Sequence, residues 1–227
     1  MNGILYLVST PIGNLEDITY RAVRVLKDVD LIAAEDTRHT RILLDHYQIH
    51  SPTTSYHDFN KYTKGKQLLS ELQSGKNLAL VTDAGTPGIS DPGYYLINLA
   101  IETGIQVVPI PGATALIAAL SVAGLPTDSF LFLGFLPRKT LARQNKLKTL
   151  AELECTLEFY ESPYRIAGLL VDIQTVLGNR RIVVTRELTK KFEEIIRGTV
   201  DEVISATAGK TWKGELAVVV EGKKEKK

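Results

Sequence analysis

Short apolar runs alternate with amphipathic segments along the first half of the chain. The runs predict strands at about 4–8, 30–34, 77–82 and 105–109, with a short extended piece near 53–56. The segments between them have helical periodicity and predict helices at about 18–28, 38–47, 61–74, 92–102 and 113–123. Because alternating strands and helices form parallel sheets, the first half is predicted to be a parallel α/β domain.

Individual residues mark the expected ends of these helices. Asp17 is expected to be the N-cap of the first helix, and Asp91-Pro92 to be the N-cap and first-turn proline of the fourth. Gly104 is expected just after the end of that fourth helix, where glycine adopts the left-handed conformation at little cost.

The second half has a different order of elements. A strand at 129–134 precedes a basic helix, a strand at 155–161, a helix at 163–177 closed by Gly178, and a strand at 180–186. Further strands are expected at 195–198 and 216–220, with a short helix between them. The linker Gly124-Leu125-Pro126-Thr127 marks the boundary. We therefore predict a parallel α/β domain at 1–124, a mixed α/β domain at 125–222 and a disordered lysine-rich tail at 223–227.

Composition restricts the class of protein. The chain has 227 residues, of which 44% are hydrophobic and 23% charged, as in globular proteins large enough for two small domains. The single cysteine, Cys155, excludes an intramolecular disulfide and suits a reducing cytoplasm. The uncharged run from Val107 to Thr127 is interrupted by prolines and glycines, so we interpret it as a buried helix with loop ends and expect no membrane span.

The segment Val81–Gly93, VTDAGTPGISDPG, is the strongest candidate for a binding loop. It follows a buried strand, and ligands of open α/β sheets bind at the carboxyl ends of strands. Its glycines let backbone amides approach a ligand closely, and Asp83 can accept from hydroxyl, amide or ammonium groups. The loop has no lysine, arginine or histidine to neutralise phosphate. It therefore suits a cationic or zwitterionic nucleoside better than a triphosphate.

Together with this loop, several further blocks resemble one known family. They occur in one order along the chain: STPIGNLED at Ser9–Asp17, AAEDTRHTRILL at Ala33–Leu44, PGATALIAALSVAGLP at Pro111–Pro126, FLGFLPRK at Phe132–Lys139, EFYESPYRI at Glu158–Ile166, RELTKKFEE at Arg186–Glu194 and GELAVVVEG at Gly214–Gly222. These blocks are similar to the ribosomal RNA small subunit methyltransferase I family of the tetrapyrrole methylase superfamily.

The resemblance implies a fold and an activity. The fold is that of class III methyltransferases, two α/β domains with the ligand cleft between them. The activity is the transfer of a methyl group from S-adenosyl-L-methionine to the ribose 2′-hydroxyl of a cytidine in the decoding region of 16S ribosomal RNA. It also implies a cytoplasmic homodimer that acts on the small ribosomal subunit, without a metal.

The resemblance also implies residues that bind the methyl donor, in both domains. They are Pro11, Ile12 and Gly13 in the first loop, Asp83, Ala84, Gly85, Thr86 and Ile89 in the second, Thr114 and Ala115 after Pro111-Gly112, and Tyr160, Glu215, Leu216 and Ala217 in the second domain.

Methyl transfer to a ribose hydroxyl requires alignment of the acceptor oxygen with the carbon–sulfur bond, and it benefits from a group that removes the proton. Carboxylates that follow predicted strands are the candidates: Glu35, Asp36, Glu161 and Glu187. Acids in such positions also cap helices or pair with arginines, and Asp36 could pair with Arg38 or Arg41.

An RNA-binding surface must be a local patch, because the formal net charge of the chain is only +1. The segment 138–148 has five basic residues and no acid. If helical, it places Lys139, Arg143 and Lys146 on one face. The candidate RNA contacts are Arg38, Arg41, Arg138, Lys139, Arg143 and Lys146. A solvated helix face is the alternative interpretation of segment 138–148.

Other activities fit the sequence less well. His46 and His50 have zinc-pair spacing, but Ser51-Pro52 ends the helix and no glutamate lies between them. The chain lacks the glycine-rich motifs of dinucleotide- and triphosphate-binding proteins. Two alternatives stay open: a methyltransferase acting on a small tetrapyrrole, and a non-catalytic RNA-binding protein of ribosome assembly.

Overall fold

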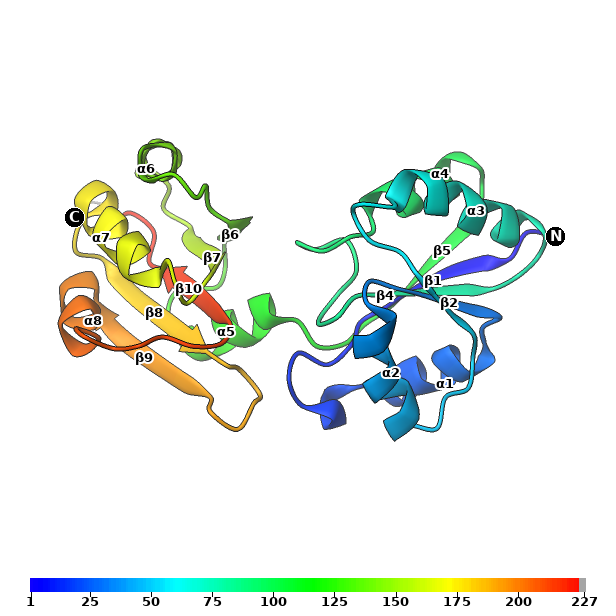
Figure 1. The fold of residues 1–227 in the computed structure, drawn as a ribbon. Helices are drawn as coiled ribbons and strands as arrows, with labels where there is room; N and C mark the ends of the chain where they lie inside the picture. Colours follow the sequence, from blue (N-terminus) through cyan, green and yellow to red (C-terminus); the bar gives the residue numbers. More distant parts are fainter. Residues whose placement is uncertain (225–227) are drawn as a thin grey trace. The chain divides into compact units, whose positions relative to one another are not determined.

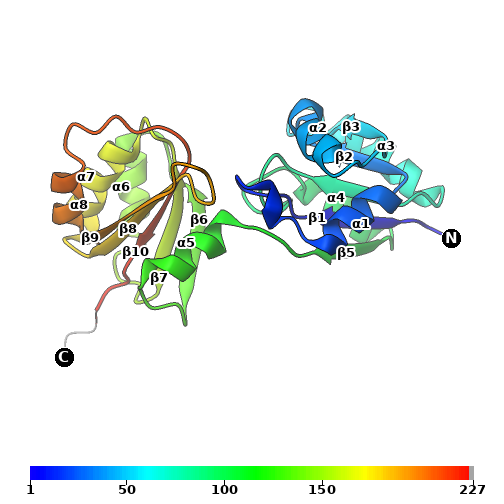
Figure 2. The ribbon, with the colours of Figure 1, turned by 90° about the horizontal axis from the view of Figure 1, so that it is seen from below.

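The computed structural model describes residues 1–224, which form two compact units (Figures 1 and 2). The first unit comprises Met1–Thr114, and the second begins at Ala115. Each unit contains its own five-stranded sheet, so the predicted α/β class with two domains is confirmed.

The sheet of the first unit is entirely parallel. Its strands are β1 (Ile4–Val8), β2 (Leu31–Ala34), β3 (Thr53–Ser55), β4 (Leu78–Val81) and β5 (Gln106–Ile110), in the order β3-β2-β4-β1-β5. The helices are the short 3-10 helix η1 (Leu15–Asp17), α1 (Tyr20–Asp28), α2 (Thr37–His46), α3 (Lys61–Gln73) and α4 (Tyr94–Glu102). Since all strands run in one direction, the loops that follow them meet at one edge, the carboxyl edge.

Helices cover both faces of this sheet, which explains the continuous apolar run of β4. Leu78 and Leu80 pack with α3 and α4 on one face, whereas Ala79 and Val81 pack with α1 and α2 on the other. Each fully buried leucine contributes about 1.5–3 kcal/mol of transfer free energy. Alternation between the two faces therefore fixes the register of the central strand, and with it the position of the loop that follows.

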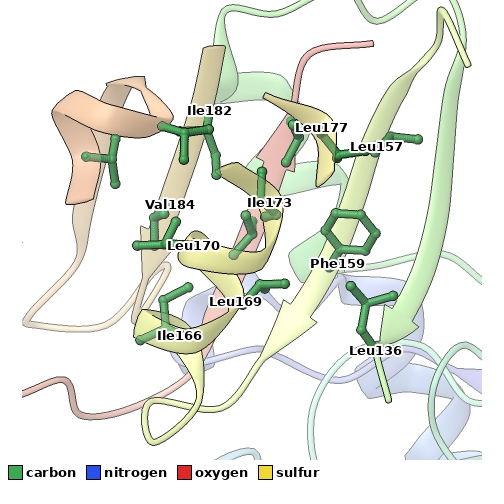
Figure 3. Packing of buried hydrophobic residues seen from close by; sticks show 14 of the residues in the cluster. Leu136, Leu157, Phe159, Ile166, Leu169, Leu170, Ile173, Leu177, Ile182 and Val184 are labelled. Carbon is green, nitrogen blue, oxygen red and sulfur yellow. The ribbon is translucent and has the colours of Figure 1, made fainter. Parts of the chain in front are cut away.

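The second unit has a mixed sheet. Its elements are α5 (Ala115–Ala123), β6 (Phe130–Phe135), α6 (Thr140–Lys148), β7 (Thr156–Glu161), α7 (Ile166–Leu177), β8 (Arg181–Arg186), β9 (Glu194–Thr199), α8 (Val200–Ala206) and β10 (Leu216–Val220). The order is β6-β7-β10-β8-β9, with β10 antiparallel to both neighbours. Figure 3 shows Leu169, Leu170 and Ile173 of α7 against Phe159 and Val184 of the sheet.

The two units divide between Thr114 and Ala115, whereas composition had indicated a division between Gly124 and Leu125. The reason is the packing of α5, which covers the face of the second sheet opposite α7. The Leu116 N–H donates to the Tyr160 hydroxyl over 3.0 Å, and Arg197 Nη2 donates to the Val122 carbonyl over 2.6 Å. The linker at Gly124 is therefore a turn within the second unit.

Two predicted helix starts were wrong. Thr19, not Asp17, caps α1, because its side chain accepts the Ala22 N–H at 3.1 Å. Helix α4 begins at Tyr94 after Gly93, so Asp91-Pro92 belongs to the preceding loop. The prediction for Gly104 was right, since its φ of +70° and its N–H bond to the Ile101 carbonyl end α4.

Two residues of the segment predicted to be a disordered tail, Lys223 and Lys224, make contacts in the structure. The Lys223 N–H donates to the Leu153 carbonyl over 2.7 Å, and Lys224 pairs with Glu221. Residues 225–227 lie outside the described residues. Within residues 1–224, no helix has the length and hydropathy to span a bilayer, and the apolar run after Val107 is divided between β5 and α5.

Candidate functional site

Two loops at the carboxyl edge of the first unit are joined by backbone hydrogen bonds. The Thr10 N–H donates to the Gly85 carbonyl over 2.9 Å, and the Gly85 N–H donates back over 3.1 Å. The Thr10 hydroxyl adds a bond of 3.0 Å to the Thr82 carbonyl. Gly85 has a φ of +87°, which residues with a side chain rarely adopt. The loop after β1 is thus fixed against the loop after β4.

The loop after β5 joins the same arrangement. The Ser9 N–H donates to the Ile110 carbonyl over 3.2 Å, and the Ser9 and Thr86 hydroxyl groups are 2.8 Å apart. A Cβ at Gly112 would lie 2.9 Å from the Ser9 Cβ, so only glycine fits there without a shift. The three loops therefore form one preorganised edge. Ser9 and Thr10 were missed by the sequence reasoning, although a Ser-Thr pair at a strand end was the available signal.

The predicted donor-binding residues of the first unit all belong to these loops or to their continuation. Pro11, Ile12 and Gly85 are buried and support the edge, whereas Asp83, Ala84, Thr86 and Thr114 are half-buried, and Gly13 and Ile89 are exposed. Asp83 is the only ionisable side chain between Val81 and Ser90. The exposed part of this edge thus presents backbone amides, small hydroxyl groups and one carboxylate.

Two acids at the end of β2 contact Asp83. The Asp36 N–H donates to Asp83 Oδ1 over 3.1 Å, and the Asp83 N–H lies 3.4 Å from Glu35 Oε2. Burial raises the pKa of Glu35, against the Asp83 N–H bond that lowers it, and the charge of Asp83 also raises it. A carboxylate whose pKa is raised is a better proton acceptor near neutral pH.

Asp36 has a structural role in the same cluster. Its side chain caps α2 by accepting the Arg38 N–H at 2.8 Å, and it pairs with the Arg38 guanidinium at 2.7 Å. These bonds to Arg38 hold the pKa of Asp36 well below its usual range. Arg38 and Arg41 remain exposed, and Arg41 pairs with Asp45 within α2. Asp36 is therefore poorly suited to accept a proton.

Glu161, another candidate base, is fully enclosed in the second unit. Its side chain is 0% exposed and binds Arg165 through both oxygens, at 2.7 and 2.8 Å, while Oε1 also accepts the Ser162 N–H. Arg165 in turn donates to the Leu136 carbonyl. This pair ties β7 to the start of α7 and encloses the carboxylate, so Glu161 is poorly suited to act as a base.

Glu187 is also engaged by neighbours, in the turn between β8 and β9. Burial works to raise its pKa, but bonds from the Glu215 N–H and from Lys190 outweigh burial and lower it. Lys190 bridges Glu187 and Glu215 at 3.0 Å each. The turn contains two non-glycine residues with positive φ, Glu187 and Thr189. Glu187 therefore holds this turn in shape rather than offering a proton acceptor.

The other predicted donor contacts of the second unit lie on β7 and α5, on β10 and at the residue before β10. Leu216 and Ala217 are buried in the central strand β10, paired on both sides, and only Glu215 is exposed. Tyr160 is half-buried, with its ring against Phe132 and its hydroxyl bound to the Leu116 N–H. Ala115 is the first residue of α5.

Glu158 on β7 is a buried acid that the sequence did not reveal. It is 0% exposed, and neither carboxylate oxygen has a hydrogen-bond partner within residues 1–224. Burial raises its pKa to about 8. Glu158 is thus held largely protonated at neutral pH, which removes the cost of an unpaired buried charge.

The basic segment 138–148, which includes α6, has fewer exposed basic residues than predicted. Arg143 is 5% exposed and binds Asp172 through Nε at 2.6 Å, so its assignment to an RNA surface was wrong. Arg143 is buried because it lies, with Leu147 and Leu150, on the side of this segment that packs against the core. Arg138, Lys139 and Lys146 are exposed, as a surface role requires.

Comparison with known proteins supports the resemblance. A family model described as tetrapyrrole (corrin/porphyrin) methylases matches residues 4–204. The ribosomal RNA small subunit methyltransferase I of Halalkalibacterium halodurans is 53% identical, over 99% of this chain and 78% of that protein. The protein of the same name from Escherichia coli O157:H7 is 51% identical, over 98% of this chain and 79% of that protein.

Solved structures share the fold at low identity. Diphthine synthase superposes with a TM-score of 0.76 at 13% identity, covering 99% of this chain and 92% of that chain. Uroporphyrin-III C-methyltransferase from Thermus thermophilus, solved with S-adenosylhomocysteine, has a TM-score of 0.66 at 18% identity, covering 96% of this chain and 97% of that chain. With about half of the residues identical to the named relatives, this chain belongs to the ribosomal RNA small subunit methyltransferase I family, among the tetrapyrrole methylases.

Proposed function

We propose that this chain transfers a methyl group from S-adenosyl-L-methionine to the ribose 2′-hydroxyl of a cytidine in the decoding region of 16S ribosomal RNA. Membership of the family supports an rRNA methyltransferase that uses this donor. One observation carries the chemical part of the proposal. The preorganised loops place Asp83 beside Glu35, the one candidate base that is neither enclosed nor held by a cationic side chain.

The donor suits the chemistry of the carboxyl edge. Its sulfonium makes the methyl group transferable to an oxygen nucleophile without a metal or a covalent enzyme intermediate. Asp83 can accept from hydroxyl or ammonium groups of such a molecule, and the Thr86 hydroxyl and the loop amides can bind its polar atoms. The absence of a basic side chain between Val81 and Gly93 avoids repulsion of a positively charged ligand.

Glu35 is proposed to accept the proton of the ribose hydroxyl. It follows β2, next to the donor loops on β4, so an acceptor oxygen bound there lies within the same edge of the sheet. Of the four candidate acids, Asp36 caps α2, Glu161 is enclosed by Arg165, and Glu187 is bound by Lys190.

We expect Glu35→Gln to lower kcat about 100-fold or more while donor affinity changes little, because the amide keeps the shape but has no basic oxygen. In the parent protein, kcat should rise with pH through the raised pKa of Glu35, since only the carboxylate accepts a proton. The variant should lack this rise. Glu102→Gln, an exposed acid at the far end of α4, is the matched control. An unchanged pH profile in Glu35→Gln would exclude Glu35 as the base.

The test of the proposed function compares two acceptors. Small ribosomal subunits from cells without this enzyme should accept labelled methyl groups, whereas a tetrapyrrole such as uroporphyrinogen should not. The solved tetrapyrrole enzymes are under 25% identical and support the fold alone. If only the tetrapyrrole became labelled, the proposed RNA substrate would be rejected in favour of a small tetrapyrrole.

We further propose a homodimer, on the family resemblance alone. A sedimentation mass equal to that of one 25.0 kDa chain would contradict it.

A further inference from the structure

Exposed aromatic side chains of the first unit gather at one edge of its sheet. Within residues 1–114, four tyrosines or phenylalanines are exposed: Tyr20 (98%), Phe59 (99%), Tyr62 (64%) and Tyr94 (78%). Tyr20 and Tyr94 are the first residues of α1 and α4, Tyr62 is the second residue of α3, and Phe59 precedes α3 by two residues. Helices that follow parallel strands begin at the carboxyl edge. All four rings therefore lie at the edge that carries the donor loops.

Phe59 and Tyr62 occupy a distinct place along this edge. The sheet order is β3-β2-β4-β1-β5, so the donor loops follow β4, β1 and β5, the acids Glu35 and Asp36 follow β2, and the two aromatic residues follow β3. The donor loops, the proposed base and the aromatic pair therefore lie in this order along the edge. An RNA strand whose reacting oxygen lies at Glu35 would extend past the end of β3, where the aromatic pair lies.

The local structure presents the Phe59 ring in a defined way. The Asn60 side chain accepts the His57 N–H at 2.9 Å and donates to the Ser55 carbonyl at 3.3 Å, which fixes the turn. The rings of His57 and Phe59 lie 6.0 Å apart in an edge-to-face arrangement. Tyr62 packs in the same manner on Tyr95, at 5.0 Å. The Tyr62 ring is therefore supported on one side by Tyr95, whereas the Phe59 ring is open to solvent on nearly its whole surface.

Basic residues outnumber acids around this pair. Lys61 lies 5.6 Å from the Tyr62 ring and pairs with Asp58 at 3.0 Å, whereas Lys64 and Lys66 lie in the first turns of α3, which contain no acid. Arg38, 90% exposed and paired with Asp36, is the second residue of α2, which follows the neighbouring strand. Aromatic faces with lysines and arginines beside them are typical of surfaces that bind single-stranded nucleic acid, where bases stack and phosphates contact the cations.

We propose that Phe59 and Tyr62 are a stacking platform for unpaired bases of the RNA substrate next to the methylated nucleotide. The inference rests on the proposed function, which supplies the RNA. It adds the residues that hold the RNA strand, and it gives base stacking as the mode of binding. Since stacking requires an unpaired base, it also implies that the substrate presents its target in a single-stranded segment.

The test measures binding and transfer separately. Phe59→Ala should weaken the affinity for small ribosomal subunits about tenfold and raise the KM for subunits similarly, because each stacked base contributes an effect of this order. Donor affinity, measured by calorimetry, should not change. Phe59→Trp should restore subunit binding, whereas Phe59→Leu should not, since leucine is apolar but has no ring face. Ile101→Ala, an exposed apolar residue (60%) at the opposite end of α4, is the matched control.

The outcomes separate this inference from the proposed function. Subunit binding that depends on the Phe59 ring, without methyl transfer by the parent protein, would reject the function and retain the stacking platform. Normal transfer with equal subunit affinity for Phe59→Ala, Phe59→Leu and the parent protein would overturn the platform and retain the function. Equal rescue by leucine and tryptophan would also overturn stacking, because a general apolar contact would then suffice.

Discussion

Replacement of Asp83 by alanine is expected to lower donor affinity about 10- to 100-fold and methyl transfer by at least as much. A hydrogen bond to a charged group contributes about 1.5–3 kcal/mol, and Asp83 is the only carboxylate between Val81 and Ser90. The variant also loses the bond of 3.1 Å that joins Asp83 Oδ1 to the Asp36 N–H, so the position of Glu35 and Asp36 at the edge is weakened.

Calorimetry with adenosylmethionine and a transfer assay on small subunits measure the two effects. Asp17→Ala, an exposed acid in η1, is the control. Intact subunit association without transfer is expected, since Asp83 is proposed to contact the donor and not the RNA. Unchanged donor affinity and unchanged transfer would show that Asp83 only supports the loop structure. Subunit association without methyl transfer by the parent protein itself would instead favour the alternative of a non-catalytic assembly protein.

The second large effect concerns stability. We expect Asp172→Ala to lower the free energy of unfolding by about 3–5 kcal/mol, because it leaves the Arg143 guanidinium buried without a counterion. Asp172 and Arg143 are 2% and 5% exposed, and Asp172 also accepts from Gln144 at 2.7 Å. The double substitution Arg143→Met with Asp172→Leu should recover most of the loss, since apolar side chains of similar volume replace the pair.

Urea denaturation of the single and double variants gives these values directly. Asp45→Ala, which removes the exposed partner of Arg41, is the control and should change the unfolding free energy by less than about 1 kcal/mol. A loss below 1 kcal/mol in Asp172→Ala would mean that Arg143 reaches solvent. In that case its original assignment to the RNA surface would have to be considered again.

The sequence predicted best where a physical constraint is local. The buried run of β4 and the loop VTDAGTPGISDPG are read from neighbouring residues, and the structure confirms a strand followed by a loop that contacts the loop after β1. Alternation of strands and helices was likewise sufficient to predict the parallel sheet, because each of β1 to β4 is followed by a helix that covers a face of the sheet. Asp83 and Gly85 were therefore placed correctly at the carboxyl edge.

Tertiary pairing limits what the sequence can predict about individual residues. Arg143 and Glu161 have the composition of surface or active-site residues, and only the positions of Asp172 and Arg165 in the fold show that they are enclosed. The unit boundary was misplaced because α5 packs on a sheet formed by residues far along the chain. The edge aromatics were not singled out, because exposure of Phe59 and Tyr62 depends on the packing of α3.

Methylation of a ribose hydroxyl in small-subunit RNA can be detected directly, because it makes the RNA resistant to alkali at one position. Small subunits from cells lacking this enzyme are incubated with the purified protein and methyl-labelled adenosylmethionine, and the RNA is then digested with alkali. A methylated 2′-hydroxyl blocks cleavage of the adjacent phosphodiester, so we expect label in one alkali-stable dinucleotide that begins with cytidine. Label recovered in mononucleotides, or no label in RNA despite measured donor binding, would contradict ribose methylation by this protein.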